Sequence, residues 1–210
     1  MVHLEELASR ALESGWASEQ VQLSRLLDDA RRLDWTPVPI RAGESAVSTL
    51  RVVDRADAHP NSLSAMVGAD AQPLHTDGAH HRSMPDIVIL SAAAPTPTPT
   101  MLCRLGKPTT AQLSGVFRVG GGKNSFYAGA VDGAGRWRYD PGCMIPTDSD
   151  AREAASQFKA LAESAKMHQW SREEEVLVIA NRLTLHGRAA AVDAGTRRVH
   201  RVALITGWDY

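Results

Sequence analysis

The residues best suited to chemistry are a histidine and an aspartate two positions apart, His75 and Asp77, in the segment Pro73–Gly78. Side chains two residues apart on an extended strand point to the same side, so this imidazole and carboxylate could share one metal ion. A second histidine would complete the facial arrangement of ligands that binds non-haem Fe(II). The pattern is not rare, since His3 and Glu5 repeat it. In isolation, a hydrogen bond at the end of a strand is its simpler explanation.

A single histidine, His186, follows an apolar run at Val176–Ala180 within the segment that continues to Arg188. The run predicts a buried strand that leads into a turn. Eleven and fifteen residues after His186 lie Arg197 and Arg201, whose separation of four predicts that both occupy one face of a strand. A buried arginine needs an anion, and a guanidinium group pairs well with a carboxylate. The alternative is an exposed basic edge strand that binds nothing.

Three motifs, taken in order, resemble a known family. They are HTDG at residues 75–78, NRLTLHGR at 181–188 and RRVHR at 197–201, and the family is the Fe(II)/2-oxoglutarate-dependent oxygenases of the taurine dioxygenase and clavaminate synthase type. The resemblance covers residues 60–206. It implies a double-stranded β-helix, or jelly roll, with Fe(II) at its open end and 2-oxoglutarate and O₂ as cosubstrates. It also implies hydroxylation or a related oxidation of a small molecule, with release of succinate and CO₂.

The resemblance further implies roles for individual residues. The metal ligands, and hence the catalytic centre, would be His75, Asp77 and His186. Arg197 would pair with the distal carboxylate of 2-oxoglutarate, with Arg201 as its neighbour or substitute. Thr100 would hydrogen-bond the same cosubstrate and Thr98 is the second candidate, because Pro-Thr-Pro replaces the Gly-Gly-Asp that usually precedes this threonine.

Other interpretations stay open at this stage. His80 or His81 could join His75 in a zinc site, although that leaves the arginine segment unexplained. The chain could also be a jelly-roll protein without turnover, or a metal-dependent isomerase or lyase that needs no cosubstrate and is indifferent to Arg197→Ala.

Substrate contacts are less defined by the sequence. The polar residues next to the motifs are His80, His81, Arg82 and Arg188. They could anchor a carboxylate or phosphate of the substrate, or they could face solvent. An amino-acid-like or natural-product substrate, free or tethered to a carrier, is compatible with this set.

The elements that must position these residues are predicted to be mainly β with appended helices, in a single jelly-roll domain over 1–210. The first 35 residues predict helices, because leucines recur at helical spacing among charges. Further helices are predicted at 109–116 and 150–164, and the proline-rich segment 92–100 is predicted to be an extended loop. The predicted strands are 49–53, 63–67, 86–91, 126–131, 176–179 and 197–206.

Composition limits the class of protein. The 210 residues include 43% hydrophobic and 22% charged ones, and the net charge is −1. This balance is typical of a globular domain and argues against a nucleic-acid or membrane-surface binder. The first residues lack the pattern of a signal peptide. Two cysteines exclude a disulfide framework and favour the cytoplasm. The oligomeric state is not encoded in any pattern we identify.

Overall fold

The computed structural model describes residues 3–60, 62–120 and 122–207, so the two ends of the predicted 1–210 domain lie outside the described residues. The chain begins with helix α1 (His3–Ser14), strand β1 (Trp16–Gln20) and helix α2 (Leu23–Arg32). The first 35 residues are therefore not wholly helical as predicted. Gly15 ends α1 with φ of +99°, a conformation that glycine adopts without strain.

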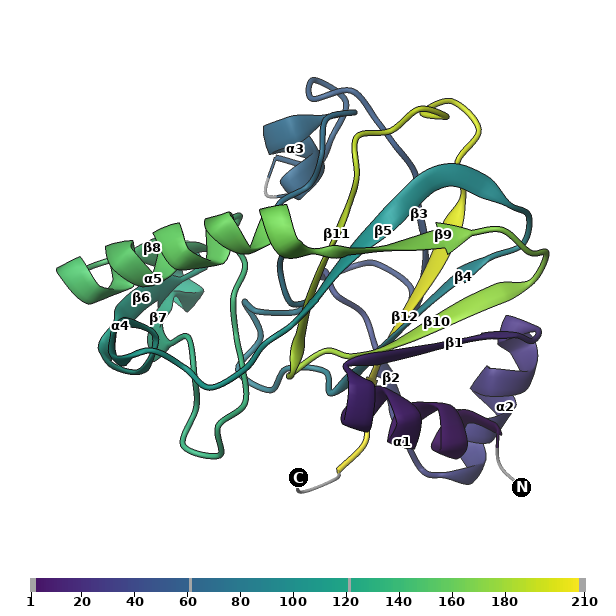
Figure 1. The fold of residues 1–210 in the computed structure, drawn as a ribbon, viewed down its shortest axis with the longest axis horizontal. Coiled ribbons are helices and arrows are strands. Elements are labelled where there is room, and N and C mark those ends of the chain that lie inside the picture. Colours follow the sequence, from purple (N-terminus) through teal and green to yellow (C-terminus); the bar gives the residue numbers. More distant parts are fainter. Residues whose placement is uncertain (1–2, 61, 121, 208–210) are drawn as a thin grey trace.

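Two antiparallel sheets form the core of the molecule (Figure 1). The large sheet has the order β1-β10-β4-β12-β2, with β3 also paired to β12. The smaller sheet has the order β11-β5-β9. Their remaining strands are β2 (Thr36–Val38), β3 (Val47–Leu50), β4 (Ile87–Ala92), β5 (Thr96–Arg104), β9 (Lys166–Trp170), β10 (Glu175–Ala180), β11 (Thr184–Arg188) and β12 (Val199–Ile205).

The large sheet is buried on both faces, as its apolar strands require. Ile87 and Ile89 of β4 belong to the cluster that packs against α1 and α2. Val88 and Leu90 belong to a second cluster that contains Leu102 and Trp170 of the smaller sheet. Because side chains alternate along a strand, β4 is apolar on both sides, and the second cluster fills the space between the sheets.

A third sheet extends the molecule on the side away from α1. Its order is β7-β6-β8, with β6 (Val116–Val119), β7 (Phe126–Gly129) and β8 (Met144–Pro146). Helix α4 (Thr110–Ser114) and helix α5 (Ser149–Ala160) pack together beside it (Figure 1). Asp148 caps α5 by accepting a hydrogen bond from the backbone N–H of Ala151.

Two further local predictions are wrong. Residues 63–67 form a short helix, α3 (Leu63–Val67), rather than a strand. The reason is the Ser62 side chain, which accepts a hydrogen bond from the backbone N–H of Ala65 and so caps a helical turn. The segment 92–100 is largely strand, because β4 continues to Ala92 and β5 starts at Thr96 despite its two prolines.

The fold class itself is as predicted, mainly β with helices on the outside. None of the helices in the described part of the chain combines the length and the apolar character that a membrane span requires.

Candidate metal centre and cosubstrate pocket

The two motif histidines and the aspartate lie together in a buried position. The Nε2 atom of His186 is 3.5 Å from a carboxylate oxygen of Asp77, and that of His75 is 4.0 Å from the other. The ligand atoms of all three lie within 4.8 Å of one another. His186 stands on β11, whereas His75 belongs to an irregular segment joined to β11 by a single β-bridge between the two histidines.

Hydrogen bonds orient two members of this triad. Nδ1 of His75 lies 3.0 Å from the carbonyl oxygen of Pro73, an acceptor that favours the tautomer with the proton on Nδ1 and leaves Nε2 free for a metal. Asn181 holds the backbone of Asp77 from both sides. Its side-chain oxygen accepts from the N–H of Asp77, and its amide donates to the carbonyls of Asp77 and Pro85.

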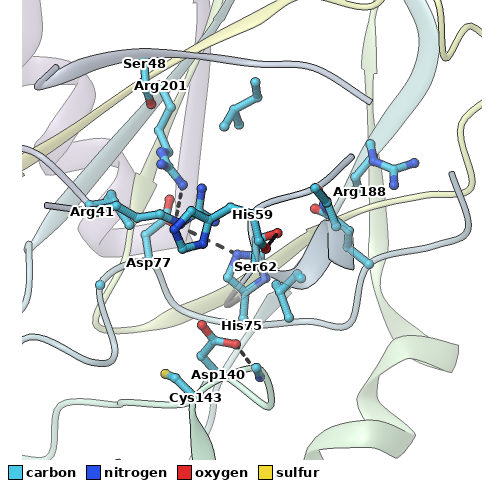
Figure 2. A pocket seen from close by; sticks show the side chains of 18 of the residues that line it. Arg41, Ser48, His59, Ser62, His75, Asp77, Asp140, Cys143, Arg188 and Arg201 are labelled. Atoms are coloured by element: carbon cyan, nitrogen blue, oxygen red, sulfur yellow. Dashed lines mark hydrogen bonds and ion pairs between the residues drawn. The ribbon is translucent and has the colours of Figure 1, made fainter. Parts of the chain in front are cut away.

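Charge is balanced around Asp77. Burial alone would raise the pKa of this carboxyl, but the Arg201 guanidinium and the two imidazoles outweigh it and lower the pKa well below its ordinary value. Arg201 Nη1 donates to Asp77 at 2.9 Å (Figure 2). Burial, and then the neighbouring His186, lower the pKa of His75. At neutral pH the site therefore combines a carboxylate with a neutral imidazole at His75, the protonation states that metal binding requires.

The triad opens into a cavity of about 830 Å³ that is also lined by Arg197, Arg201 and Thr100. Arg197 is 5% exposed, and its Nε finds no hydrogen-bond partner in the described part of the chain. Burial, and then the nearby Arg188, lower its pKa to about 10, so it remains a cation at neutral pH. Arg201 forms an ion pair with Asp77, whereas no ion pair of Arg197 is found among the described residues, so its guanidinium could bind an anion that enters the cavity.

The two arginines were predicted to share one face of a strand, and the structure agrees only in part. Strand β12 starts at Val199, so Arg197 precedes it. The backbone N–H of Arg197 closes a turn on the carbonyl of Asp193, and both arginine side chains are nevertheless buried at the cavity.

Arg188 is not the free substrate anchor that its place in the sequence allowed. Its guanidinium donates to the carbonyls of Gly68, Ala69, Asp70 and Ala189 at 2.7–3.0 Å. It thus holds the chain between α3 and the first metal motif.

The neighbouring histidines do not support the zinc alternative. Nε2 of His80 and Nε2 of His81 each lie 2.9 Å from the carbonyl oxygen of Ile40. Among the described residues, the triad is the only group of three or more histidine, cysteine and acidic side chains close enough to hold a metal ion.

Sequence analysis did not identify three polar residues that the structure brings to the site. They are Asn181, Glu44 and Asp140. Asn181 had a usable signal, since it begins the NRLTLHGR motif. Glu44, which lies 3.5 Å from Arg201, and Asp140, on the cavity wall beside His75, come from loops with no distinctive pattern.

Comparison with known proteins places this geometry in a familiar fold. The sequence matches no protein-family profile and no curated protein. Among solved structures, an asparagine oxygenase in complex with Fe(II), 2S,3S-3-hydroxyasparagine and succinate superposes with a TM-score of 0.67 and 17% identity, over 97% of this chain and 79% of that one. A variant of the non-haem iron oxygenase OrfP, in complex with (3S)-hydroxy-L-arginine, gives 0.71 and 18% over the same shares. A complex of OrfP with Fe, succinate and (3S)-hydroxy-L-arginine gives a TM-score of 0.70 and 15% identity, over 97% of this chain and 80% of that one.

These similarities establish the fold. The chain has the jelly-roll architecture of the non-haem iron oxygenases, and the predicted fold class is confirmed.

Proposed function

We propose that the protein is a non-haem Fe(II)/2-oxoglutarate-dependent oxygenase that hydroxylates a small, amino-acid-like substrate and releases succinate and CO₂. One observation carries the proposal. A buried triad of His75, Asp77 and His186 opens into the same cavity as Arg197, a buried cation that forms no ion pair with any carboxylate in the described part of the chain. A metal site alone would not need that cation.

The triad fits Fe(II) by its donor set. Two imidazoles and one carboxylate are the facial ligands of non-haem iron oxygenases and leave positions open for other molecules. The Nδ1 atom of His186 is buried without a hydrogen-bond partner among the described residues, so its Nε2, which faces Asp77, is the nitrogen directed at the site. Bound there, Fe(II) would supply the activation of O₂ that couples decarboxylation of 2-oxoglutarate to oxidation of a C–H bond.

The cosubstrate would be held by Arg197 and Thr100. A guanidinium group can take both oxygens of a carboxylate, and Thr100 adds a hydroxyl to the same cavity. Arg201 remains the alternative partner, but its bond to Asp77 ties it to the metal side of the site. The role of this chain would then be to place the cosubstrate and substrate side by side and to exclude water.

An amine-bearing substrate would suit the opposite wall of the cavity. Asp140 lies there, on the side of His75 away from Arg201 (Figure 2), and accepts a hydrogen bond from the backbone N–H of Gly142. Its carboxylate would attract a substrate ammonium group. The hydroxylated asparagine and arginine named for the structural neighbours support the same substrate class. A substrate of this class that is tethered to a carrier is the alternative.

The decisive experiment is an anaerobic titration of the purified apoprotein with Fe(II) and then with 2-oxoglutarate, followed by visible absorption. A weak charge-transfer band that needs both additions is the expected result. Separate replacement of His75, Asp77 and His186 by alanine should abolish the band and succinate formation. A variant that keeps full 2-oxoglutarate consumption would show that the metal site is wrongly placed.

The same titration distinguishes the alternatives. Metal binding without the band would favour a cosubstrate-independent jelly-roll enzyme, for which Arg197→Ala would leave turnover unchanged. Failure to bind metal would favour a catalytically inert jelly-roll protein. We further propose a single domain and a cytoplasmic location, the latter from the scarcity of cysteine.

A further inference from the structure

Strand β5 presents three threonines to the interior at alternate positions. Thr96, Thr98 and Thr100 are buried, whereas the prolines between them are more exposed. The register of β5 against β9 shifts between Thr96 and Thr100, which is the signature of a β-bulge. The three threonines thus point to the same side of β5, but their hydroxyls have different hydrogen-bond partners.

The hydroxyls of Thr96 and Thr98 both bond the same carboxylate. Thr96 and Thr98 each donate to a different oxygen of Asp193. Thr98 also accepts a hydrogen bond from the backbone N–H of Val192 at 3.1 Å. Thr98 is the second candidate for the cosubstrate contact. Its single hydroxyl proton is already donated to Asp193, and Thr98 is not among the residues that line the cavity.

The third hydroxyl, that of Thr100, accepts a hydrogen bond from a side chain instead of donating one. The indole Nε1–H of Trp170 donates to Thr100 Oγ1 at 3.1 Å, and both residues are 2% exposed. A hydroxyl has one proton to donate and two lone pairs to accept with. Since Trp170 can only donate, it occupies an accepting lone pair and leaves the proton of Thr100 available to an acceptor in the cavity, which Thr100 and Arg197 both line.

We propose that Trp170 is a positioning residue that makes Thr100 a hydrogen-bond donor to the distal carboxylate of the cosubstrate. The inference rests on the proposed function and deepens it. An anion binds more tightly to a hydroxyl that already points toward it, since no reorientation of the hydroxyl is then needed on binding.

Trp170 is well held for this task. It ends β9, opposite Thr96 in the register with β5, and belongs to the cluster between the two sheets. The ring of His168 meets its indole edge-on at a centroid distance of 4.6 Å. A ring packed on several sides keeps its N–H in one direction, and the polarity of Thr100 then follows from the fold itself.

Anaerobic calorimetry on the Fe(II)-loaded protein tests this role with two cosubstrates. One is 2-oxoglutarate and the other is 2-oxopentanoate, the same keto acid without the distal carboxylate. We expect Thr100→Val to weaken 2-oxoglutarate binding by roughly tenfold or more, and Trp170→Phe by roughly three- to tenfold. Thr100→Ser should bind like the wild type, and no variant should alter the weaker binding of 2-oxopentanoate.

The double variant separates positioning from a general packing role. If Trp170 acts through Thr100, W170F combined with T100V should bind 2-oxoglutarate no more weakly than T100V alone. Trp137→Phe is the matched control, because Trp137 is equally buried but packs on Phe158 away from the cavity. Additive losses, an equal loss for both keto acids, or an unchanged W170F would overturn the inference.

A further measurement needs no change at Trp170. The indole Nε1–H resonance assigned to Trp170 should shift when Thr100 is replaced by valine, and again when 2-oxoglutarate binds. A resonance that is unmoved in both cases would contradict the role. A wild type that binds Fe(II) but not 2-oxoglutarate would overturn the proposed function and this inference together. Normal 2-oxoglutarate binding by W170F would overturn the inference alone.

Discussion

The two segments that carry the residues of the triad are built in different ways. His186 lies on β11, whose backbone is paired residue by residue with β5 from Thr184 to Arg188. His75 and Asp77 lie in an irregular segment that, among the described residues, is joined to β11 by one β-bridge. A few backbone hydrogen bonds hold that segment, such as the one from the N–H of Thr76 to the carbonyl of Tyr139. Other backbone groups are bonded by side chains, from Arg188 before the motif, Asn181 within it and Arg138 after it.

This difference indicates where the site is vulnerable. Buried backbone groups must find partners, and in a strand those partners are supplied by any sequence. In the irregular segment several of the partners are particular side chains, so a single substitution can remove them. We therefore expect metal binding to depend more on the residues that bond the HTDG segment than on those that flank His186.

Asn181→Ala should have the largest effect. It leaves three buried backbone groups of Asp77 and Pro85 without partners, which should cost about 3 kcal/mol of unfolding free energy and weaken Fe(II) binding by roughly 10–100-fold. Urea denaturation and anaerobic Fe(II) titration measure the two quantities.

Thr184→Val is the matched control for Asn181. Thr184 is fully buried on β11 and donates to the carbonyl of Gly15 at 3.0 Å. Its replacement should cost about 1 kcal/mol and leave the affinity for Fe(II) unchanged. Equal losses of Fe(II) affinity in the two variants would abolish the contrast between the segments.

Gly187→Ala should have the next largest effect, because it acts where the two segments meet. A Cβ atom at Gly187 would lie 2.8 Å from the carbonyl oxygen of Gln72 and 3.0 Å from that of Pro73. The segment leading to His75 would have to move, at a cost of about 1–3 kcal/mol, with weaker Fe(II) binding. Gly106→Ala meets nothing within 4 Å and should change neither stability nor affinity.

Arg138→Met should have a smaller effect. The Arg138 guanidinium donates to the carbonyls of Ala79, His81 and Arg82, beyond the ligands rather than at them. We expect a loss of about 1–2 kcal/mol in thermal or urea unfolding and only a severalfold weaker Fe(II) affinity. A loss of Fe(II) affinity as large as that of Asn181→Ala would mean that the whole loop after HTDG positions the metal.

The smallest expected effect is that of histidine substitutions on the pH dependence of stability. Burial is the main cause that lowers the pKa of His75, His80 and His168 below 6.5. The unfolded chain therefore binds more protons below this pH, and the stability of the apoprotein should fall as the pH decreases from about 7 to 5. His75→Gln should flatten that slope, as should His168→Gln outside the site. A slope unchanged by both would show that other groups govern it.

The sequence predicted the residues that meet at the cavity better than the residues that support them. HTDG, NRLTLHGR and RRVHR contain five residues that the structure brings to one cavity, His75, Asp77, His186, Arg197 and Arg201, because residue types and their spacing are local properties of the sequence. Asn181, Trp170 and Arg138 act through hydrogen bonds to residues 104, 70 and 57 positions away. No local pattern encodes such contacts.

The two errors at 63–67 and 92–100 have different origins. Residues 63–67 have the apolar character of a strand, but a local contact, the Ser62 cap, favours a helix, and the distant Arg188 bonds the carbonyl of Gly68 at its end. The prolines of 92–100 suggest a loop, yet β5 pairs with β9 and β11 on either side and extends through them. Tertiary pairing outweighed local preference in this second case.

By itself, the sequence determined the class of fold, the buried strands and the residue types that can bind a metal and an anion. These follow from hydrophobic periodicity and from the chemistry of individual side chains. Only the tertiary structure decided which threonine faces the cavity, which of the two arginines bonds Asp77 and which side chains bond the irregular segment. Those outcomes depend on distances between elements far apart in the chain, and only the packing of these elements in the folded protein sets those distances.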